Sequence, residues 1–215
     1  MYRIVFLLIN SLWLISCHQE KAAFTDLPYY NDPTFTPVFL NDKAAVKDKI
    51  THTIDDFEFL NQDSVLVNQK LIENKIHVAN FIFTSCGSIC PRMTTNMKIV
   101  SDSLQNNTDV VLLSYSVTPW IDTPSVLKAY KKNRGITNDN WHFLTGSMSK
   151  TYELARKSYY AEEDIGFSKD STDFLHTEHF LLVDKNKRIR GIYNGTLVLE
   201  MQQLIEHIKL LQANM

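Results

Sequence analysis

Two cysteines separated by three residues are the part of this chain best suited to chemistry. Cys86 and Cys90 directly follow the apolar run Ile76–Phe83, which has the composition of a short buried strand. We expect the chain to leave the sheet at Thr84-Ser85 and to begin a helix there. Residues four apart on a helix point the same way, so both sulfurs could reach one metal ion or each other. The positive end of the helix favours thiolate over thiol.

The third cysteine lies at the end of an N-terminal leader. Arg3 precedes an apolar stretch over residues 4–15 that is too short to span a bilayer comfortably, which predicts a signal peptide over residues 1–16. The sequence Leu14-Ile15-Ser16-Cys17 resembles a bacterial lipobox. This resemblance implies that Cys17 is acylated and becomes the mature N-terminus. The alternative is a signal peptide cleaved elsewhere, with Cys17 incidental.

Acylation of Cys17 would account for the odd number of thiols in an exported protein, and more than one acyl chain gives a stable anchor. It leaves Cys86 and Cys90 as the remaining pair. In an oxidising compartment this pair would form a disulfide unless it is kept reduced or binds a metal.

Length and composition indicate one globular domain with a tail. The chain has 215 residues, of which 44% are hydrophobic and 21% charged, and its formal net charge is −2. This charge gives no electrostatic case for nucleic-acid binding. We divide the chain into the signal peptide (1–16), a membrane tether or linker (17–48) and a domain (49–215). The aromatic and proline content of Leu27–Pro37 suggests that part of the tether packs on the domain.

The elements that must position the thiols alternate between strands and helices. The parallel strands of such a βαβ unit lie next to or near each other. The pattern predicts an α/β fold, a thioredoxin-like mixed sheet flanked by helices with an N-terminal hairpin and a late hairpin insertion. The expected strands are 57–60, 65–67, 76–83, 109–117, 141–146, 180–183 and 188–193, and the expected helices follow Cys90, run from Pro124 to Gly135, and cover 150–160 and 197–211, with a loop over 161–173.

Four segments in order resemble the SCO/SenC family of thioredoxin-like copper proteins. The likeness extends from about His52 to Leu211. A C-x-x-x-C pair alone is a weak signal, whereas four segments at suitable separations are specific. They are Phe81–Pro91, with the C-x-x-x-C-P pattern, Ser116–Pro124, Phe143–Gly146 and His176–Asp184.

The resemblance implies a copper site made by Cys86, Cys90 and His176. Thiolates suit Cu(I), and an imidazole suits Cu(I) or Cu(II). Three protein ligands also leave a position open for a partner's ligand. By the family pattern the histidine lies six residues before Leu182, which selects His176. An odd separation in an extended strand would put His179 on the opposite face. We expect the other histidines to be ordinary core or surface residues: His18, His52, His77, His142 and His207.

Two positions depart from the family pattern without removing a ligand. Gly87 stands where a proline is common, which leaves the loop freer. Thr118 stands where the family has an acidic residue, which removes a carboxylate at that position. We expect these changes to alter copper affinity or redox potential.

The resemblance implies a copper metallochaperone that serves an extracytoplasmic apoprotein, namely the copper centre of a cytochrome c oxidase. We place it in the bacterial cell envelope, lipid-anchored through Cys17 and facing the periplasm. The alternative is a thiol–disulfide oxidoreductase that uses Cys86 and Cys90 as its redox pair. Such enzymes usually carry C-x-x-C and do not need His176. A purely structural disulfide is the third reading, but so short a loop constrains little chain entropy.

Overall fold

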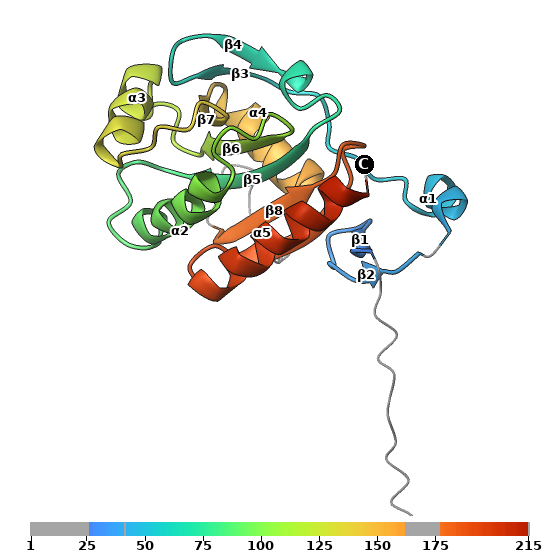
Figure 1. Cartoon of the computed structure of the whole chain (residues 1–215). Helices are drawn as coiled ribbons and strands as arrows, with labels where there is room; N and C mark the ends of the chain where they lie inside the picture. The colour runs from blue at the N-terminus through green and yellow to red at the C-terminus, as the bar shows by residue number, and fades with distance from the viewer. Residues whose placement is uncertain (1–25, 41, 162–176, 215) are drawn as a thin grey trace, which may run out of the picture.

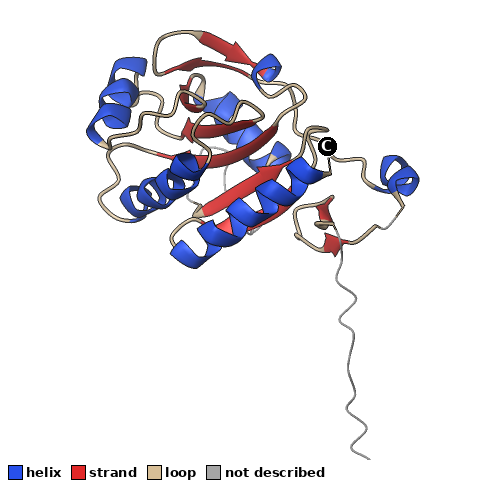
Figure 2. Cartoon of the chain, in the orientation of Figure 1, coloured by secondary structure: helices blue, strands red, loops and turns tan. Residues whose placement is uncertain are grey.

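The structure is a computed structural model that describes residues 26–40, 42–161 and 177–214. Within these residues, nine strands form one mixed sheet that has helices against both faces (Figures 1 and 2). The strands are β1 (Tyr29–Tyr30), β2 (Pro37–Val38), β3 (Glu58–Asn61), β4 (Leu66–Asn68), β5 (Ile76–Ile82), β6 (Val110–Ser116), β7 (Trp141–Thr145), β8 (His179–Val183) and β9 (Ile189–Asn194). The helices are α1 (Lys43–Lys49), η1 (a 3-10 turn, Gln69–Leu71), α2 (Ile89–Ser103), α3 (Pro124–Asn133), α4 (Met148–Glu153), η2 (a π-helical segment, Leu154–Ser158) and α5 (Val198–Ala213).

The strand order is β2-β1-β9-β8-β5-β6-β7-β3-β4. β5 lies beside β6 in parallel, with Ile76 opposite Val110 and Ile82 opposite Ser116, which confirms the predicted βαβ unit. β8 runs antiparallel to β5 and forms the predicted late hairpin with β9. All seven residues of β5 and of β6 are buried. This burial explains why their sequences are continuous apolar runs rather than alternating patterns.

The two faces of the sheet carry separate hydrophobic clusters. On one face, Val78 of β5 packs in a cluster with Met97 of α2 and Leu204 of α5. These two helices lie side by side across the sheet (Figure 1). On the other face, Ala79 joins a cluster that includes Tyr159, directly after η2. Alternate residues of β5 therefore belong to alternate clusters, as the two-residue period of a strand requires.

The N-terminal segment from Asp26 onward is part of the folded structure. β1 pairs with β2 and, through Tyr30 opposite Ile189, with β9. Tyr29 forms a small apolar cluster with Val46 and with Ile50, directly after α1. Part of the predicted tether therefore packs on the domain. The signal peptide and Cys17 lie outside the described residues.

The backbone confirms the predicted limits of α3. Thr123 caps α3, because its side chain accepts a hydrogen bond from the Val126 backbone N–H at 3.4 Å. Pro124 is the first helical residue, and Gly135, with φ of +62°, follows the helix end as predicted. Of the predicted loop over 161–173, only Ala161 lies within the described residues. Among those residues, no helix is long and apolar enough to cross a membrane.

The predicted start of the cysteine helix is wrong. Instead of beginning at Thr84-Ser85, α2 begins at Ile89, and its N-cap Ser88 makes no side-chain capping bond within the described part of the chain. Thr84 lies four residues before this N-cap, and its hydroxyl and backbone N–H both donate to Asp122. Cys86 therefore lies in the loop before α2, while Cys90 is the second residue of the helix.

Candidate metal centre

The thiols lie at the carboxyl end of β5, where the chain turns into α2. Cys90 is 3% exposed and belongs to the hydrophobic cluster between α2 and the sheet. Cys86 is half-buried and packs against the same cluster. Both are free thiols in the structure, so the predicted disulfide stays a prediction. Their side chains are hydrogen-bonded to each other. Two sulfurs in contact can chelate one soft metal ion or close a disulfide.

The two thiols differ in acidity. Burial by itself would raise the pKa of Cys86, but the backbone N–H groups of Cys90, Ser88 and Ile89 and the Cys90 thiol lower it below its usual value. Burial raises the pKa of Cys90 to about 12. The expected helix effect on thiolate formation therefore holds for Cys86 and is outweighed at Cys90. Cys86 is therefore the thiol that ionises first.

A buried carboxylate that the sequence analysis missed holds this loop in place. Asp122 is fully buried and accepts hydrogen bonds from the Thr84 backbone N–H at 3.2 Å and from the Thr84 hydroxyl. Ser116 and Thr118 donate to it as well, at 2.6 and 3.0 Å. Asp122 therefore ties the end of β5 to the end of β6. Its charge adds to burial in raising the pKa of Cys90.

The sequence did contain a signal for this role. Asp122 directly precedes Thr123, the residue that caps α3. Hydroxyl residues follow the ends of two parallel strands, Thr84 after β5 and Thr118 after β6, and such ends meet at one edge of the sheet.

The predicted histidine ligand lies outside the described residues. His176 belongs to the undescribed range 162–176, and the described residues contain no group of three or more His, Cys, Asp or Glu side chains that could hold a metal ion. His179 is the first residue of β8, and its ring meets that of Phe35 edge-to-face with centroids 6.0 Å apart. Phe35 packs with the cluster opposite Cys90. His176 therefore stays a predicted ligand, and His179 packs on the face away from the thiols.

Three other histidines have structural contacts, as expected. His77 is fully buried with its Nε2 3.0 Å from the Tyr159 hydroxyl, and burial lowers its pKa to about 3. His52 places its Nε2 2.7 Å from the Ser158 carbonyl oxygen. His207 meets a tyrosine hydroxyl through its Nδ1. None of these three rings is directed at the thiols, because each is committed to a contact elsewhere.

Exposed apolar side chains surround this end of the sheet. Trp120 and Ile121 follow the end of β6 and are 59% and 45% exposed. Val198 and Leu199 begin α5, where the adjoining Gly195 carbonyl accepts a hydrogen bond from Asn96 of α2. Both pairs come from segments that leave the same edge of the sheet as the cysteine loop. This edge therefore combines two free thiols with an apolar rim.

Comparisons with known proteins identify a family that matches this chain. The SCO1/SenC family matches the chain over residues 46–212. The SCO1 protein homolog of Bacillus subtilis (strain 168) is 34% identical over 166 residues, which cover 76% of this chain and 85% of that protein.

Solved structures show the same likeness. A SCO1/SenC family lipoprotein from Bacillus anthracis str. Ames has a TM-score of 0.66 at 28% identity, covering 76% of this chain and 96% of that one. BsSco, described as a Sco family cytochrome c oxidase assembly protein with a disulfide switch, has a TM-score of 0.62 at 32% identity, covering 74% and 93%. ScoI of Bradyrhizobium japonicum, solved with copper bound, shares the fold with a TM-score of 0.58 at 21% identity, covering 73% and 98%.

Proposed function

The chain belongs to the SCO1/SenC family, and from this premise we propose that it binds copper and delivers it to an apoprotein outside the cytoplasm. The recipient we propose is the copper centre of a cytochrome c oxidase. BsSco, which this chain resembles, is described as an oxidase assembly protein. The observation that carries the proposal is the contact between the half-buried Cys86 and the buried Cys90.

In this proposal, copper is held as Cu(I) or Cu(II) by Cys86, Cys90 and His176. The Cys86 thiolate is the first ligand, because its pKa is lowered and its sulfur is accessible. Copper then displaces the proton of Cys90, and this displacement makes binding weaken as pH falls. Two thiolates and one imidazole suit both oxidation states of copper.

Handover requires that a ligand of the recipient enter the open coordination position. The half-buried Cys86 faces the surface from which such a ligand would approach. Trp120 and Leu199, at the rim of this edge, provide apolar area for a transient contact with the recipient. We therefore propose that the recipient docks on this rim.

We further propose that the protein is attached to the bacterial cell envelope through an acylated Cys17 and faces the periplasm. The likeness to the Bacillus anthracis lipoprotein supports this anchor. Mass spectrometry of the mature N-terminus should find diacylglyceryl-Cys17. An unmodified terminus at another residue would contradict the anchor and leave the copper site untouched.

One observation favours thiol–disulfide exchange as a second candidate function. An accessible thiol with a lowered pKa beside a buried thiol with a raised one resembles a nucleophile and its resolving partner. The Cys86 thiolate would attack a partner's disulfide, forming a mixed disulfide and releasing one partner thiolate. The Cys90 sulfur would then attack the Cys86 sulfur, forming the Cys86–Cys90 disulfide and releasing the partner's second thiolate. The pair would lose two electrons to the partner and become a disulfide. This chemistry does not require His176.

A copper titration of the reduced protein separates the two functions. We expect stoichiometric binding by the wild type, with thiolate-to-Cu(II) absorption bands, and loss of tight binding in Cys86→Ser and Cys90→Ser. His176→Ala should weaken binding and alter the bands while leaving thiol reactivity intact. His179→Ala is the matched control and should bind like the wild type.

The opposite pattern in the two histidine variants would show that the ligand has been assigned to the wrong position. If the wild type shows no tight copper binding but its Cys86–Cys90 disulfide is readily reduced, the oxidoreductase function replaces the copper function.

A further inference from the structure

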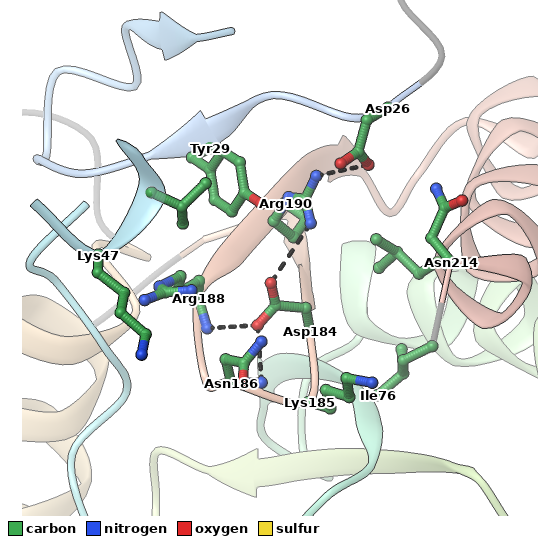
Figure 3. A pocket seen from close by; sticks show the side chains of 12 residues that line it. Asp26, Tyr29, Lys47, Ile76, Asp184, Lys185, Asn186, Arg188, Arg190 and Asn214 are labelled. Carbon is green, nitrogen blue, oxygen red and sulfur yellow. Dashed lines mark hydrogen bonds and ion pairs between the residues drawn. The ribbon is translucent and has the colours of Figure 1, made fainter. Parts of the chain in front are cut away.

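A cavity of about 480 Å³ lies at the end of the sheet opposite the thiols. Figure 3 shows the side chains that line it. Ile76, the first residue of β5, forms part of its wall, whereas the cysteines follow the last residue of that strand. The other walls come from the N-terminal segment, α1, the β8–β9 hairpin and the end of α5. Four cationic side chains and two carboxylates line it, so the net side-chain charge is +2.

Arg190 uses both carboxylates of the cavity. Its guanidinium is 2.8 Å from a carboxylate oxygen of Asp26 and 3.3 Å from one of Asp184. It also donates to the carbonyl oxygens of Leu27 and Pro28 and lies 3.8 Å from the centroid of the Tyr29 ring. Arg190 is only 4% exposed. Four of its five N–H donors are used in these bonds, so Arg190 is a structural clamp, and it also neutralises much of the carboxylate charge.

The remaining oxygen of Asp184 is also occupied. It accepts hydrogen bonds from the backbone N–H groups of Asn186 at 2.9 Å and Arg188 at 3.0 Å. This bonding shapes the β8–β9 turn and directs the turn residues toward the cavity. Asp184 is therefore not available to pair with the nearby cations.

Three cationic side chains remain without a carboxylate partner among the described residues: Lys47, Lys185 and Arg188. The Arg188 Nε is buried and has no hydrogen-bond partner in the described part of the chain. A buried guanidinium donor left unsatisfied is costly, which points to a missing acceptor. The end of α5 contributes only about half a negative charge through its carbonyl groups, too little to balance three cations.

We propose that this cavity binds the phosphate group of a phosphate ester, with Arg188 as the bidentate donor and Lys47 and Lys185 as flanking charges. A guanidinium matches the geometry of two phosphate oxygens, and lysines add point charge. The cavity is larger than phosphate alone requires, which leaves room for the organic part of the ester.

Two sources can supply this chemistry, a phospholipid headgroup and a soluble phosphate ester. Asp26 lies at the cavity, nine residues after Cys17, and a chain of that length spans at most about 32 Å. If Cys17 is acylated, as proposed above, the cavity lies within that distance of the membrane surface. The headgroup source therefore rests on the proposed anchor, whereas the cavity itself does not.

Lysine acetylation read by mass spectrometry tests the site on the full chain. Inorganic phosphate, compared with chloride at equal ionic strength, should slow the acetylation of Lys47 and Lys185 about threefold at twice the dissociation constant. Lys132, an exposed lysine on α3, provides the internal reference and should not change. Arg188→Gln should abolish the protection, and Lys132→Gln, the matched loss of one charge elsewhere, should retain it.

The source is resolved by reconstitution into vesicles. Protection of Lys47 and Lys185 by phosphatidylglycerol vesicles, lost in Arg188→Gln and retained in Lys132→Gln, would establish the headgroup source. Protection by phosphate alone would support a soluble ester and leave the cavity proposal intact. Equal protection of Lys132, or unchanged protection in Arg188→Gln, would overturn the site. An unacylated Cys17 would remove the anchor without affecting the phosphate measurement.

Discussion

The two ends of β5 each bury a charged side chain, but they balance it in opposite ways. At the carboxyl end, Asp122 is surrounded by neutral donors, namely hydroxyl groups and one backbone N–H. At the amino end, Arg190 contacts two carboxylates, two carbonyl oxygens and the face of Tyr29. The ends are separated by the seven residues of β5, or about 23 Å.

This difference shows how one sheet separates two electrostatic environments. Neutral donors satisfy Asp122 without bringing a positive charge, so the thiol end keeps a negative charge, which suits a copper cation. At the amino end of β5, Arg190 forms ion pairs with both nearby carboxylates. The remaining cations there have no carboxylate partner among the described residues, so this end suits an anion. The choice of partners for one buried group therefore decides which sign of ligand each end favours.

The largest expected effect comes from removing the ion pairs of Arg190 at the amino end of β5. Arg190→Met leaves Asp184 buried without its ionic partner, and we expect a loss of about 3–5 kcal/mol in the free energy of unfolding. Urea denaturation measures this loss. Copper affinity should be unchanged if the two ends are independent. Lys98→Met, which removes an exposed ion pair with Asp102, is the control and should cost less than about 1 kcal/mol.

Lowering the pH should destabilise the protein through His77, a buried residue of β5. Burial lowers the pKa of His77 from 6.5 to about 3 in the folded protein, so below pH 6.5 the unfolded chain binds a proton that the folded chain does not. The contribution of His77 to the free energy of unfolding is therefore fully present above pH 6.5 and is lost as the pH decreases. His77 should account for a loss of about 2.7 kcal/mol at pH 4.5.

Denaturation of His77→Gln at pH 7 and pH 4.5 checks this contribution. Its stability should fall less on acidification than that of the wild type. Burial lowers the pKa of His142 to about 4, so His142 should add a similar pH dependence. The free energy of unfolding of the double variant His77→Gln/His142→Gln should therefore change least with pH. An unchanged slope in His77→Gln would mean that the ring gains its proton in the folded state.

Asp122→Asn tests the carboxyl end. The amide keeps the size of the side chain but removes its charge and turns one acceptor into a donor. We expect copper affinity to fall by about tenfold to a hundredfold, as for other residues that support metal ligands. Competition with a copper chelator measures this change. Asp102→Asn, on the exposed surface of α2, removes the same charge and should leave affinity unchanged.

The smallest effect is expected at the cap beside this carboxylate. Thr123→Ala removes the bond from the Val126 N–H to the Thr123 hydroxyl and should cost about 1 kcal/mol of unfolding free energy. Thr123→Ser keeps the bond and is the control. Copper affinity should not change in either variant. A loss of affinity in Thr123→Ala would show that the capping residue, and not only Asp122, positions the thiols.

Local sequence patterns determined most of the framework of this protein. The apolar runs predicted β5 and β6, Pro124 and Gly135 marked the limits of α3, and the order of the strands predicted both hairpins. These features depend on neighbours within a few residues, so a single sequence contains them. The ordered motifs also identified the family, and with it the predicted ligands.

Only the tertiary structure decided which distant groups satisfy the buried charges. It assigned Thr84 to Asp122, 38 residues away, and so moved the start of α2 to Ile89. It brought Arg190 to Asp26 across 164 residues and so left the cations of the cavity without partners. No local pattern records such pairings, because they depend on which strand ends meet at one edge of the sheet.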